Sequence, residues 1–399
     1  MSGFCSAAIK TSHTSNKPAP EMKKTLKTVA WMVLAAVGIS TGCKPSGLTA
    51  DKNSKQSEKR IEIQGTGATF PYPLYSKWAL EYQKAAPRIR INYQSSGSGG
   101  GIRQITERIV DFGASDTPMT ERELARVSGK LLHIPTTLGA VVLAYNLPGV
   151  SKLNLSPEVI AGIFLGEVKR WNEPAIAKLN AGVALPNRPI TVVYRTDGSG
   201  TTAVFTEYLS KTSATWKEKV GTGKSVKFPV GLGSKGNEGV SGQLKMIPGG
   251  IGYVELAYAK QAKLSYATVQ NSKGQFVEPS LESVTAAAGS MSEAMPDDLR
   301  MSIVDAPGEL AYPLGTFTYI LVYEEQPDLE KGRELAEFLW WAIHEGQRIG
   351  TALHYAPLPS QVVTKIEAKL RCMKSGPQVL LATENEESEK TCNQHIPNT

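Results

Sequence analysis

Short apolar runs alternate with helical patterns from residue 61 to residue 371. Between the runs, apolar side chains recur at helical spacing, as where Leu74, Trp78 and Tyr82 fall at i, i+4 and i+8 on one face. Such alternation is typical of an α/β fold with mostly parallel strand pairing. The expected strands are residues 61–63, 88–94, 110–116, 139–146, 190–195, 251–255 and 316–323.

Further helices are expected through Ile102 and Ile105 and over residues 156–166, 333–345 and 359–371. The helix at 333–345 should turn four apolar side chains inward, namely Leu335, Phe338, Leu339 and Ala342. After Met373 the periodicity is lost, so we expect residues 373–399 to form a tail outside the fold. A chain of 399 residues favours two domains.

The segment before Cys43 has the features of an export signal. It has a basic start, an apolar stretch over residues 29–39 and small residues ahead of Cys43. The stretch is too short to cross a bilayer, whose apolar core needs roughly 20 residues. We therefore expect residues 1–43 to be a removed signal segment, with the true start at Met22.

The end of this segment resembles a bacterial lipoprotein signal, in which the cysteine is acylated and becomes the new N-terminus. Ser40 stands where that signal usually has an aliphatic residue, so an ordinary cleaved signal peptide stays open beside a lipid anchor on Cys43. Residues 44–60 are polar and lack periodicity, which predicts a flexible tether. The folded part should begin near Ile61.

The net charge of +7 is concentrated in this discarded segment. Five lysines and one acidic residue precede Cys43, so removing them lowers the net charge to +3. The rest of the chain has no stripe of Lys and Arg interleaved with aromatic residues, and we expect no nucleic-acid partner. No group of Cys or His has metal-ligand spacing, so neither a metal nor another cofactor is expected. Cys372 and Cys392 remain in an exported protein and form a possible disulfide.

Three short stretches share one design, in which a strand end is followed by a Gly and Ser/Thr turn and then a helix. The first N–H groups of a helix lack partners within the helix and carry a partial positive charge, so an oxyanion is bound well there. Three such turns in one chain, with Arg195 attached to one of them, predict a cage for a tetrahedral anion. They are GTGATFP (65–71), SSGSGGG (95–101) and RTDGSGTT (195–202).

Other interpretations exist for each stretch. A single Gly/Ser turn before a helix is most often only an N-cap, and Arg195 with Asp197 would also fit a plain surface ion pair. Ser98 and Ser199 do not match the G-x-S-x-G turn of hydrolases. GTGKS (221–225) is similar to the end of a phosphate-binding P-loop, but Glu218 replaces its first glycine, which argues against a nucleotide site.

The order and spacing of six motifs resemble the phosphate-binding protein of bacterial phosphate ABC transporters, the PstS type. The resemblance covers about residues 61–371. It implies an α/β, two-lobed periplasmic-binding-protein fold with a two-stranded hinge and the ligand in a cleft between the lobes. Lobe I would be residues 61–138 plus 314–372 and lobe II residues 139–313. The motifs are GTGATFPYPLYSKWALEYQ, INYQSSGSGGGIRQI, VDFGASDTPMT, YRTDGSGTT, GVSGQL and PGGIGYVELAYAKQ.

The resemblance also implies which residues contact the ligand, because the matching positions keep the family's residue types. Asp197 would orient Arg195 without touching the anion. The hinge would lie near residues 138–140 and 312–314. The implied phosphate-binding residues are Thr69, Phe70, Ser98, Asp116, Arg195, Ser199, Gly200 and Thr201.

Asp116 is the residue that would set selectivity. A carboxylate facing an anion is unfavourable unless the anion still carries a proton, as phosphate does at neutral pH. Ionised Asp116 would accept the hydrogen bond of that proton, whereas sulfate has none and would leave a buried charge unpaired. We therefore expect tight binding of phosphate and rejection of sulfate.

The chain is thus interpreted as a binding protein and not an enzyme. It would be periplasmic or in the cell envelope, monomeric and lipid-anchored, and would deliver inorganic phosphate to the permease and ATPase subunits of an ABC transporter. The alternatives are a phosphomonoesterase using Ser98 or Ser199, a binding protein for another oxyanion, and an adhesion or signalling module that reuses the scaffold. No histidine or carboxylate cluster lies near either serine in sequence, which argues against the esterase.

Overall fold

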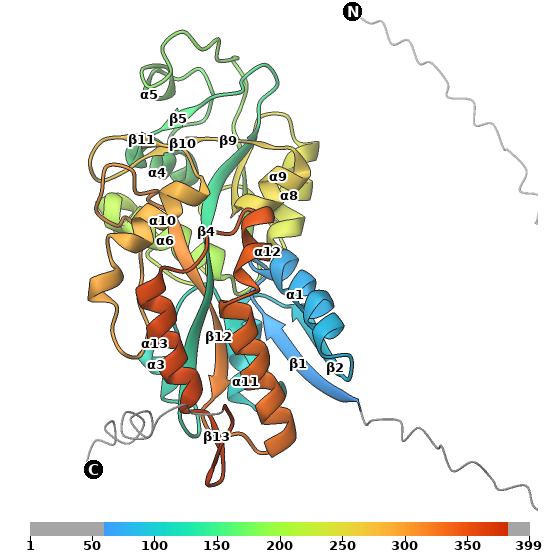
Figure 1. The fold of residues 1–399 in the computed structure, drawn as a ribbon. Coiled ribbons are helices and arrows are strands. Elements are labelled where there is room, and N and C mark those ends of the chain that lie inside the picture. The colour runs from blue at the N-terminus through green and yellow to red at the C-terminus, as the bar shows by residue number, and fades with distance from the viewer. Residues whose placement is uncertain (1–59, 382–399) are drawn as a thin grey trace, which may run out of the picture. The chain divides into compact units, whose positions relative to one another are not determined.

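A single long strand, β4 (Leu131–Asn146), connects both halves of the main sheet. The computed structural model describes residues 60–381. Up to Ala140, β4 pairs antiparallel with β12 (Gly315–Tyr323), and from Val141 onward it pairs with β8 (Gly250–Glu255). Figure 1 shows β4 running through both halves, with β12 beside it in only one. The strand therefore passes from one half to the other between Ala140 and Val141.

The strand order of the main sheet is β2-β1-β3-β12-β4-β8-β6-β7, and β9 adds to β4. We call the half built on β2, β1, β3 and β12 lobe I and the half built on β8, β6 and β7 lobe II. The outer strands pair in parallel, as expected, but β12 and β4 pair antiparallel with their neighbours. The remaining strands of this sheet are β1 (Ile61–Gly67), β2 (Ile89–Ser95), β3 (Phe112–Ser115), β6 (Thr191–Arg195), β7 (Leu232–Ser234) and β9 (Ser265–Tyr266).

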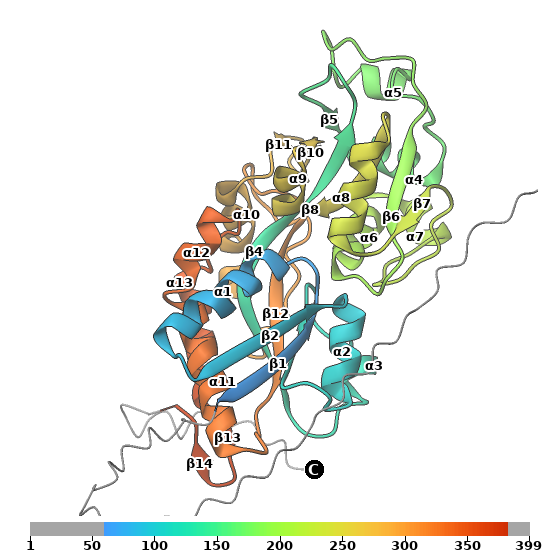
Figure 2. The same cartoon turned by 90° about the vertical axis from the view of Figure 1, so that its right-hand side faces the viewer.

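Helices cover both faces of lobe I. Figure 2 shows α1, α11 and α13 on one side of its sheet and α2 on the other. The apolar faces predicted for α1 and α11 are confirmed, since Leu74, Trp78 and Tyr82 are buried, as are the four inward residues of α11. The helices of lobe I are α1 (Tyr72–Ala85), α2 (Ser98–Thr106), α3 (Glu121–Leu124), α11 (Leu329–Ile343), α12 (Gln347–Ala352) and α13 (Ser360–Arg371).

Lobe II repeats this layering, with α8 on β8 and β6 and α6 on β8. Its helices start at recognisable signals. The Ser156 hydroxyl accepts the N–H of Val159 at 3.4 Å ahead of α4, and Gly166, which caps the C-terminus of this helix, has a φ of 77°. The helices between β4 and β12 are α4 (Pro157–Leu165), α5 (Pro174–Ala177), α6 (Gly200–Thr212), α7 (Ala214–Lys219), α8 (Gly236–Met246), α9 (Leu256–Ala262) and α10 (Leu281–Gly289). A small sheet contains β5 (Asn154–Leu155), β10 (Thr268–Gln270) and β11 (Phe276–Val277), and one 3₁₀ turn follows α10 at Ser292–Ala294.

The first half of β4 is longer than its sequence predicts. The sequence pattern predicts a strand over 139–146 only. The part that the structure adds contains Pro135, and proline is unfavourable inside a sheet. The register with β12 shifts between Thr318 and Tyr319, so that Thr136 has no opposite residue at this bulge. The hydroxyl of Thr136 donates to the carbonyl of Thr318 at 3.1 Å instead.

The segment after Met373 differs from the expected tail. A hairpin of β13 (Lys374–Ser375) and β14 (Gln378–Val379) continues the fold, and Leu380 is buried against α11 near Gly332. Its strands have only two residues each, too few for a period to be visible. Cys372 is disulfide-bonded, but its expected partner Cys392 lies outside the described residues, so the pairing stays a prediction.

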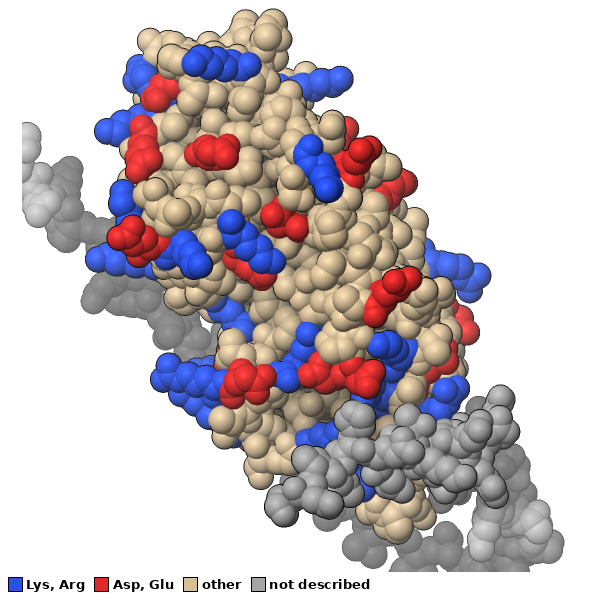
Figure 3. Space-filling view, turned by 90° about the vertical axis from the view of Figure 1, so that its left-hand side faces the viewer, with Lys and Arg blue, Asp and Glu red and all other residues tan. Residues whose placement is uncertain are grey.

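The expected signal segment, Cys43 and the tether up to residue 59 also lie outside the described residues. No helix within residues 60–381 is long and apolar enough to span a membrane. On the face shown in Figure 3, Lys and Arg side chains of the described part are interspersed with Asp and Glu. That face therefore offers no extended area of one charge sign.

Candidate functional site

The third loop connects β6 to α6 and places its arginine inside the protein. Arg195 donates through Nε to Asp197 Oδ1 at 2.8 Å and through Nη2 to Asp197 Oδ2 at 2.5 Å. The side chain of Arg195 is 1% exposed and that of Asp197 is 10% exposed. This rules out the surface ion pair that the sequence left open. The forked geometry also fixes the direction of the guanidinium.

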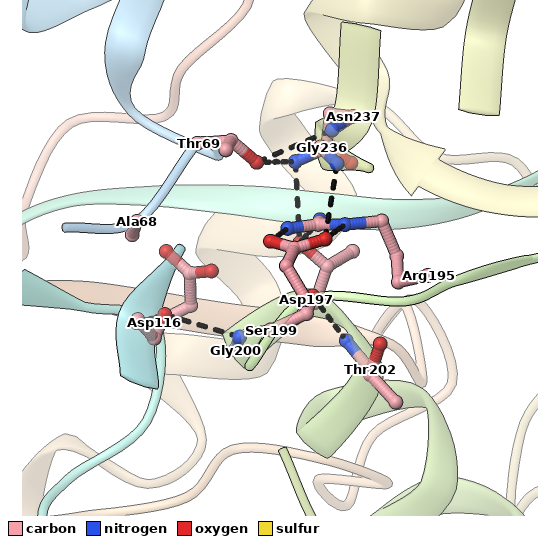
Figure 4. Close-up of polar contacts among 12 residues, drawn as sticks. Ala68, Thr69, Asp116, Arg195, Asp197, Ser199, Gly200, Thr202, Gly236 and Asn237 are labelled. Carbon is pink, nitrogen blue, oxygen red and sulfur yellow. Dashed lines mark hydrogen bonds and ion pairs between the residues drawn. The ribbon is translucent and has the colours of Figure 1, made fainter. Parts of the chain in front are cut away.

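Arg195 and Asp197 each stabilise the ionised form of the other. Burial opposes the charge of Arg195, but its hydrogen bonds and charge interaction with Asp197 help to raise the pKa of the guanidinium overall. Burial likewise acts against ionised Asp197, while Arg195 and the N–H of Gly236, at 3.0 Å, lower the pKa of that carboxyl. Both groups are therefore charged at neutral pH. Asp197 thus fixes the guanidinium of Arg195 (Figure 4), and that Asp197 does not touch a bound anion stays a prediction.

Ser199 is the N-cap of α6. Its hydroxyl accepts the N–H of Thr202 at 3.0 Å, and its own N–H donates to the carbonyl of Lys224 at 2.8 Å. The N-cap interpretation is thus correct for this serine. An N-cap oxygen keeps its own proton, so Ser199 still has a hydroxyl donor to offer.

The second loop meets the third loop across the lobes. Ser98 is fully buried at the start of α2, and its oxygen accepts the N–H of Gly200 at 3.0 Å and that of Asp116 at 3.3 Å. Beside it, the N–H of Gly99 donates to the carbonyl of Gly198 at 2.8 Å. The N-termini of α2 and α6 are therefore side by side.

Glycine is required where these loops touch. A Cβ on Gly200 would lie 2.5 Å from Asp116 Oδ2 and 2.5 Å from Ser98 Oγ. Gly97 has a φ of 86°, and a Cβ there would lie 2.6 Å from Asp197 Oδ2. These residues therefore allow the two lobes to close to backbone contact.

The first loop carries Thr69 and Phe70. Thr69 is buried, and its hydroxyl oxygen accepts two hydrogen bonds from Asn237, from the backbone N–H at 3.3 Å and from Nδ2 at 2.8 Å. The ring of Phe70 is buried beside Tyr355, and its carbonyl accepts the Tyr355 hydroxyl at 2.7 Å. The backbone N–H is thus the donor that Phe70 has to offer an anion.

Two of the threonines have their oxygens occupied by N–H donors. Thr201 Oγ1 accepts from Arg195 Nη1 at 3.3 Å and from Asn237 Nδ2 at 3.2 Å, and Thr69 Oγ1 accepts twice from Asn237. A hydroxyl that already accepts two hydrogen bonds has its proton left to donate. Both threonines are therefore set as donors.

Asp116 is a buried carboxylate among these donors. It follows β3, its Oδ1 accepts the Thr318 hydroxyl at 3.2 Å, and Ser98 gives it a second side-chain hydrogen bond. Burial raises the pKa of Asp116 to about 7, although Arg195 and these hydroxyls act in the opposite direction. Asp116 therefore titrates near neutral pH in the ligand-free protein.

The structure brings all eight predicted ligand residues to one place between the lobes. Figure 4 shows Thr69, Asp116, Arg195 and Gly200 around a common region, although they come from both lobes. No group of three or more His, Cys, Asp or Glu within residues 60–381 is placed to hold a metal ion. The site therefore provides a set of fixed hydrogen-bond donors, one guanidinium and one titratable carboxyl.

Known proteins have sequences similar to this one. A model of the PBP superfamily domain matches residues 50–345. The phosphate-binding protein PstS of Xylella fastidiosa (strain 9a5c) is 45% identical over 341 residues, which are 82% of this chain and 93% of the relative. PstS of Pasteurella multocida (strain Pm70) is 48% identical over 311 residues, covering 77% of this chain and 89% of the relative. The chain belongs to the PstS family.

A solved structure gives the same fold. The phosphate-binding protein from Stenotrophomonas maltophilia superposes with a TM-score of 0.61 at 19% identity, covering 77% of this chain and 94% of that chain. At this identity the likeness concerns the fold alone. PstS proteins are substrate-binding proteins and not enzymes, so we assign no catalytic residue.

Asn237 is the site residue that the sequence analysis missed. It is fully buried in the first turn of α8, and besides its bonds to Thr69 and Thr201 its Oδ1 accepts the N–H of Glu255 at 3.0 Å. It therefore joins the first loop of lobe I to the third loop of lobe II. The signal was present in GSKGNEG (233–239), where β7 is followed by glycines and a helix, the same design as in the other three loops.

Proposed function

We propose that this protein binds inorganic phosphate between its lobes and delivers it to the permease and ATPase subunits of a phosphate ABC transporter. Its PstS relatives are named phosphate-binding proteins. A buried dianion needs many fixed donors, because an uncompensated charge in a dry site is very costly. Two helix N-termini, the threonine hydroxyls and Arg195 supply such donors.

The observation that carries the proposal is the buried carboxyl of Asp116 among these donors. At neutral pH phosphate still holds a proton, and ionised Asp116 accepts its hydrogen bond. Sulfate has the same shape and charge but no proton, so its oxygen would face a carboxylate oxygen without a hydrogen between them. We infer that Asp116 selects the protonated anion and that Arg195 and the helix N-termini provide most of the affinity.

The raised pKa of Asp116 gives this selection a pH dependence. Above pH 7 the carboxylate is ionised and only accepts, so sulfate is rejected. Below that pH the carboxyl becomes protonated and is itself a donor that sulfate can use. Discrimination between phosphate and sulfate should therefore weaken as the pH falls through about 7.

Calorimetric titration with phosphate, arsenate and sulfate at pH 8 and pH 5.5 tests the proposal. We expect phosphate and arsenate, which both keep a proton, to bind at pH 8, and sulfate to bind measurably only at the lower pH. Asp116→Asn should bind sulfate at pH 8 as well, since an amide donates. Asp111→Asn is the matched control, because Asp111 pairs with Lys331 instead. Equal binding of sulfate and phosphate by the wild type at pH 8 would refute the role of Asp116.

We propose further that the protein works in the periplasm or cell envelope, held by a lipid on Cys43. Closure of the lobes over phosphate would bend the chain where it changes lobes, near residues 138–140 and 312–314. Both walls of the site come from one chain, so a monomer is sufficient for binding.

A further inference from the structure

The GTGKS segment, residues 221–225, has no role in the function proposed so far. It follows α7 and is attached to α6. The N–H of Gly223 donates to the hydroxyl of Thr206 at 3.1 Å, and the hydroxyl of Thr222 donates to the carbonyl of Thr206 at 3.3 Å. The carbonyl of Lys224 accepts the N–H of Ser199. The segment is thus fixed to the helix whose N-terminus faces the site.

The side chain of Lys224 leaves lobe II and contacts lobe I. Its Nζ lies 3.0 Å from Oε2 and 3.2 Å from Oε1 of Glu123, so both carboxylate oxygens accept. The two side chains are 14% and 27% exposed, which shields the pair from solvent more than an ordinary surface ion pair. It spans 101 residues of sequence and joins two lobes that must separate for an anion to enter.

The side chain of Glu123 is held in place by residues of its own lobe, independently of Lys224. It forms a capping box at the start of α3, where its Oε2 accepts the N–H of Thr120 at 2.8 Å and its own N–H donates to Thr120 Oγ1 at 3.2 Å. The turn from Asp116 leads directly into this helix. Because both partners are pre-positioned, the pair loses little side-chain freedom when it forms.

We propose that Lys224 and Glu123 form a latch that holds the lobes closed over phosphate without touching it. The proposal rests on the function proposed above. An interaction made only in the closed state adds its free energy to the binding of any ligand that closes the lobes. The latch acts after the anion has entered, so it should slow phosphate release and leave the association rate and the preference for phosphate over sulfate unchanged.

A double-mutant cycle tests this latch. Lys224→Met removes the charge with similar length, and Glu123→Gln removes the other charge while glutamine still completes the capping box. We expect each single variant to weaken phosphate binding about 2- to 5-fold, the size expected for such an ion pair, through faster dissociation. The double variant should be no weaker than either single one, since the first substitution already removes the pair. Stopped-flow and calorimetry give both quantities.

Glu324→Gln is the matched control. It removes the ion pair of Glu324 with Lys130, at 2.6 Å, which lies within lobe I and should not affect phosphate affinity. Unchanged affinity in both single variants would overturn the latch, and so would losses that add in the double variant. A wild type that fails to bind phosphate would instead refute the proposed function, and the wild-type titration alone decides that. Thermal unfolding without phosphate checks that the variants are folded.

Discussion

The two lobes form the two walls of the site, and each controls the charges of its side chains in a different way. In lobe II, Arg195 and Asp197 are paired through two hydrogen bonds, and each keeps the other ionised. In lobe I, Asp116 is held by hydroxyl groups, and burial raises its pKa to about 7. One wall thus has a permanent positive group whose charge is balanced, and the other has a carboxyl that changes its charge near neutral pH.

Under the proposed function, affinity and selectivity would belong to different lobes. The donors of lobe II keep their charge across the physiological pH range and would act on any small oxyanion. The carboxyl of lobe I would distinguish anions by the proton they carry. Asn237 and the Lys224–Glu123 pair connect the walls and neither adds a net charge to the site.

The largest effect is expected for Arg195→Ala. It removes the guanidinium and leaves Asp197 as a buried charge without its partner, which costs about 3–5 kcal/mol of stability. Phosphate binding should be lost. Urea unfolding and calorimetry measure the two effects. In Arg195→Ala with Asp197→Asn, part of the stability should return but not the binding, and a double variant as unstable as the single one would contradict this account of the pair.

The next effect concerns Asp116→Asn in the absence of phosphate. The folded pKa of Asp116 lies above its ordinary value of 3.8, so the native state binds more protons and stability falls as the pH rises from about 4 to 7. Replacement by Asn removes this loss, worth about 4 kcal/mol for a carboxyl at this depth. We expect the variant to be more stable than the wild type at pH 8. Unfolding curves from pH 4 to pH 8 measure the difference, and Asp111→Asn serves as control.

A variant less stable than the wild type at pH 8 would mean that Asp116 is well solvated or neutralised in the ligand-free protein. The ionised form of Asp116 would then not be destabilised by burial, and the contrast between the paired charges of lobe II and the buried carboxyl of lobe I would disappear.

The smallest of these effects is expected for Asn237→Ala, which tests how the walls are joined. The substitution removes the Nδ2 donor to Thr69 and Thr201 and leaves the N–H of Glu255 without its acceptor, while the backbone N–H of residue 237 still donates to Thr69. We expect a loss of about 1–3 kcal/mol in stability and weaker phosphate binding, because each of the two hydroxyls loses one of the two N–H donors that fix its proton as the one left to donate. Selectivity against sulfate should persist, since Asp116 is untouched. Loss of selectivity in this variant would place part of the discrimination in the hydroxyls.

Most elements could be predicted because their signals are local. The face of Leu74, Trp78 and Tyr82 repeats within one helix, and each Gly and Ser/Thr turn is a few consecutive residues. The start of β4 could not be predicted, because a bulge opposite Thr318 tolerates Pro135 and that bulge depends on a partner strand far along the chain. The hairpin after Met373 was missed because its strands are too short to show a period.

The sequence by itself determined the long strands and helices of the two lobes, apart from the first half of β4, and which turns have the donors for an oxyanion, because periodicity, capping and glycine content act over a few residues. Only the tertiary structure decided that Ser98 contacts Gly200, that Asn237 orients Thr69 and that Lys224 contacts Glu123. It also decided that Asp116 is buried deeply enough for its pKa to rise to about 7. Those properties depend on groups separated by about a hundred residues or more and on the exclusion of water between them, and neither is written in any local pattern.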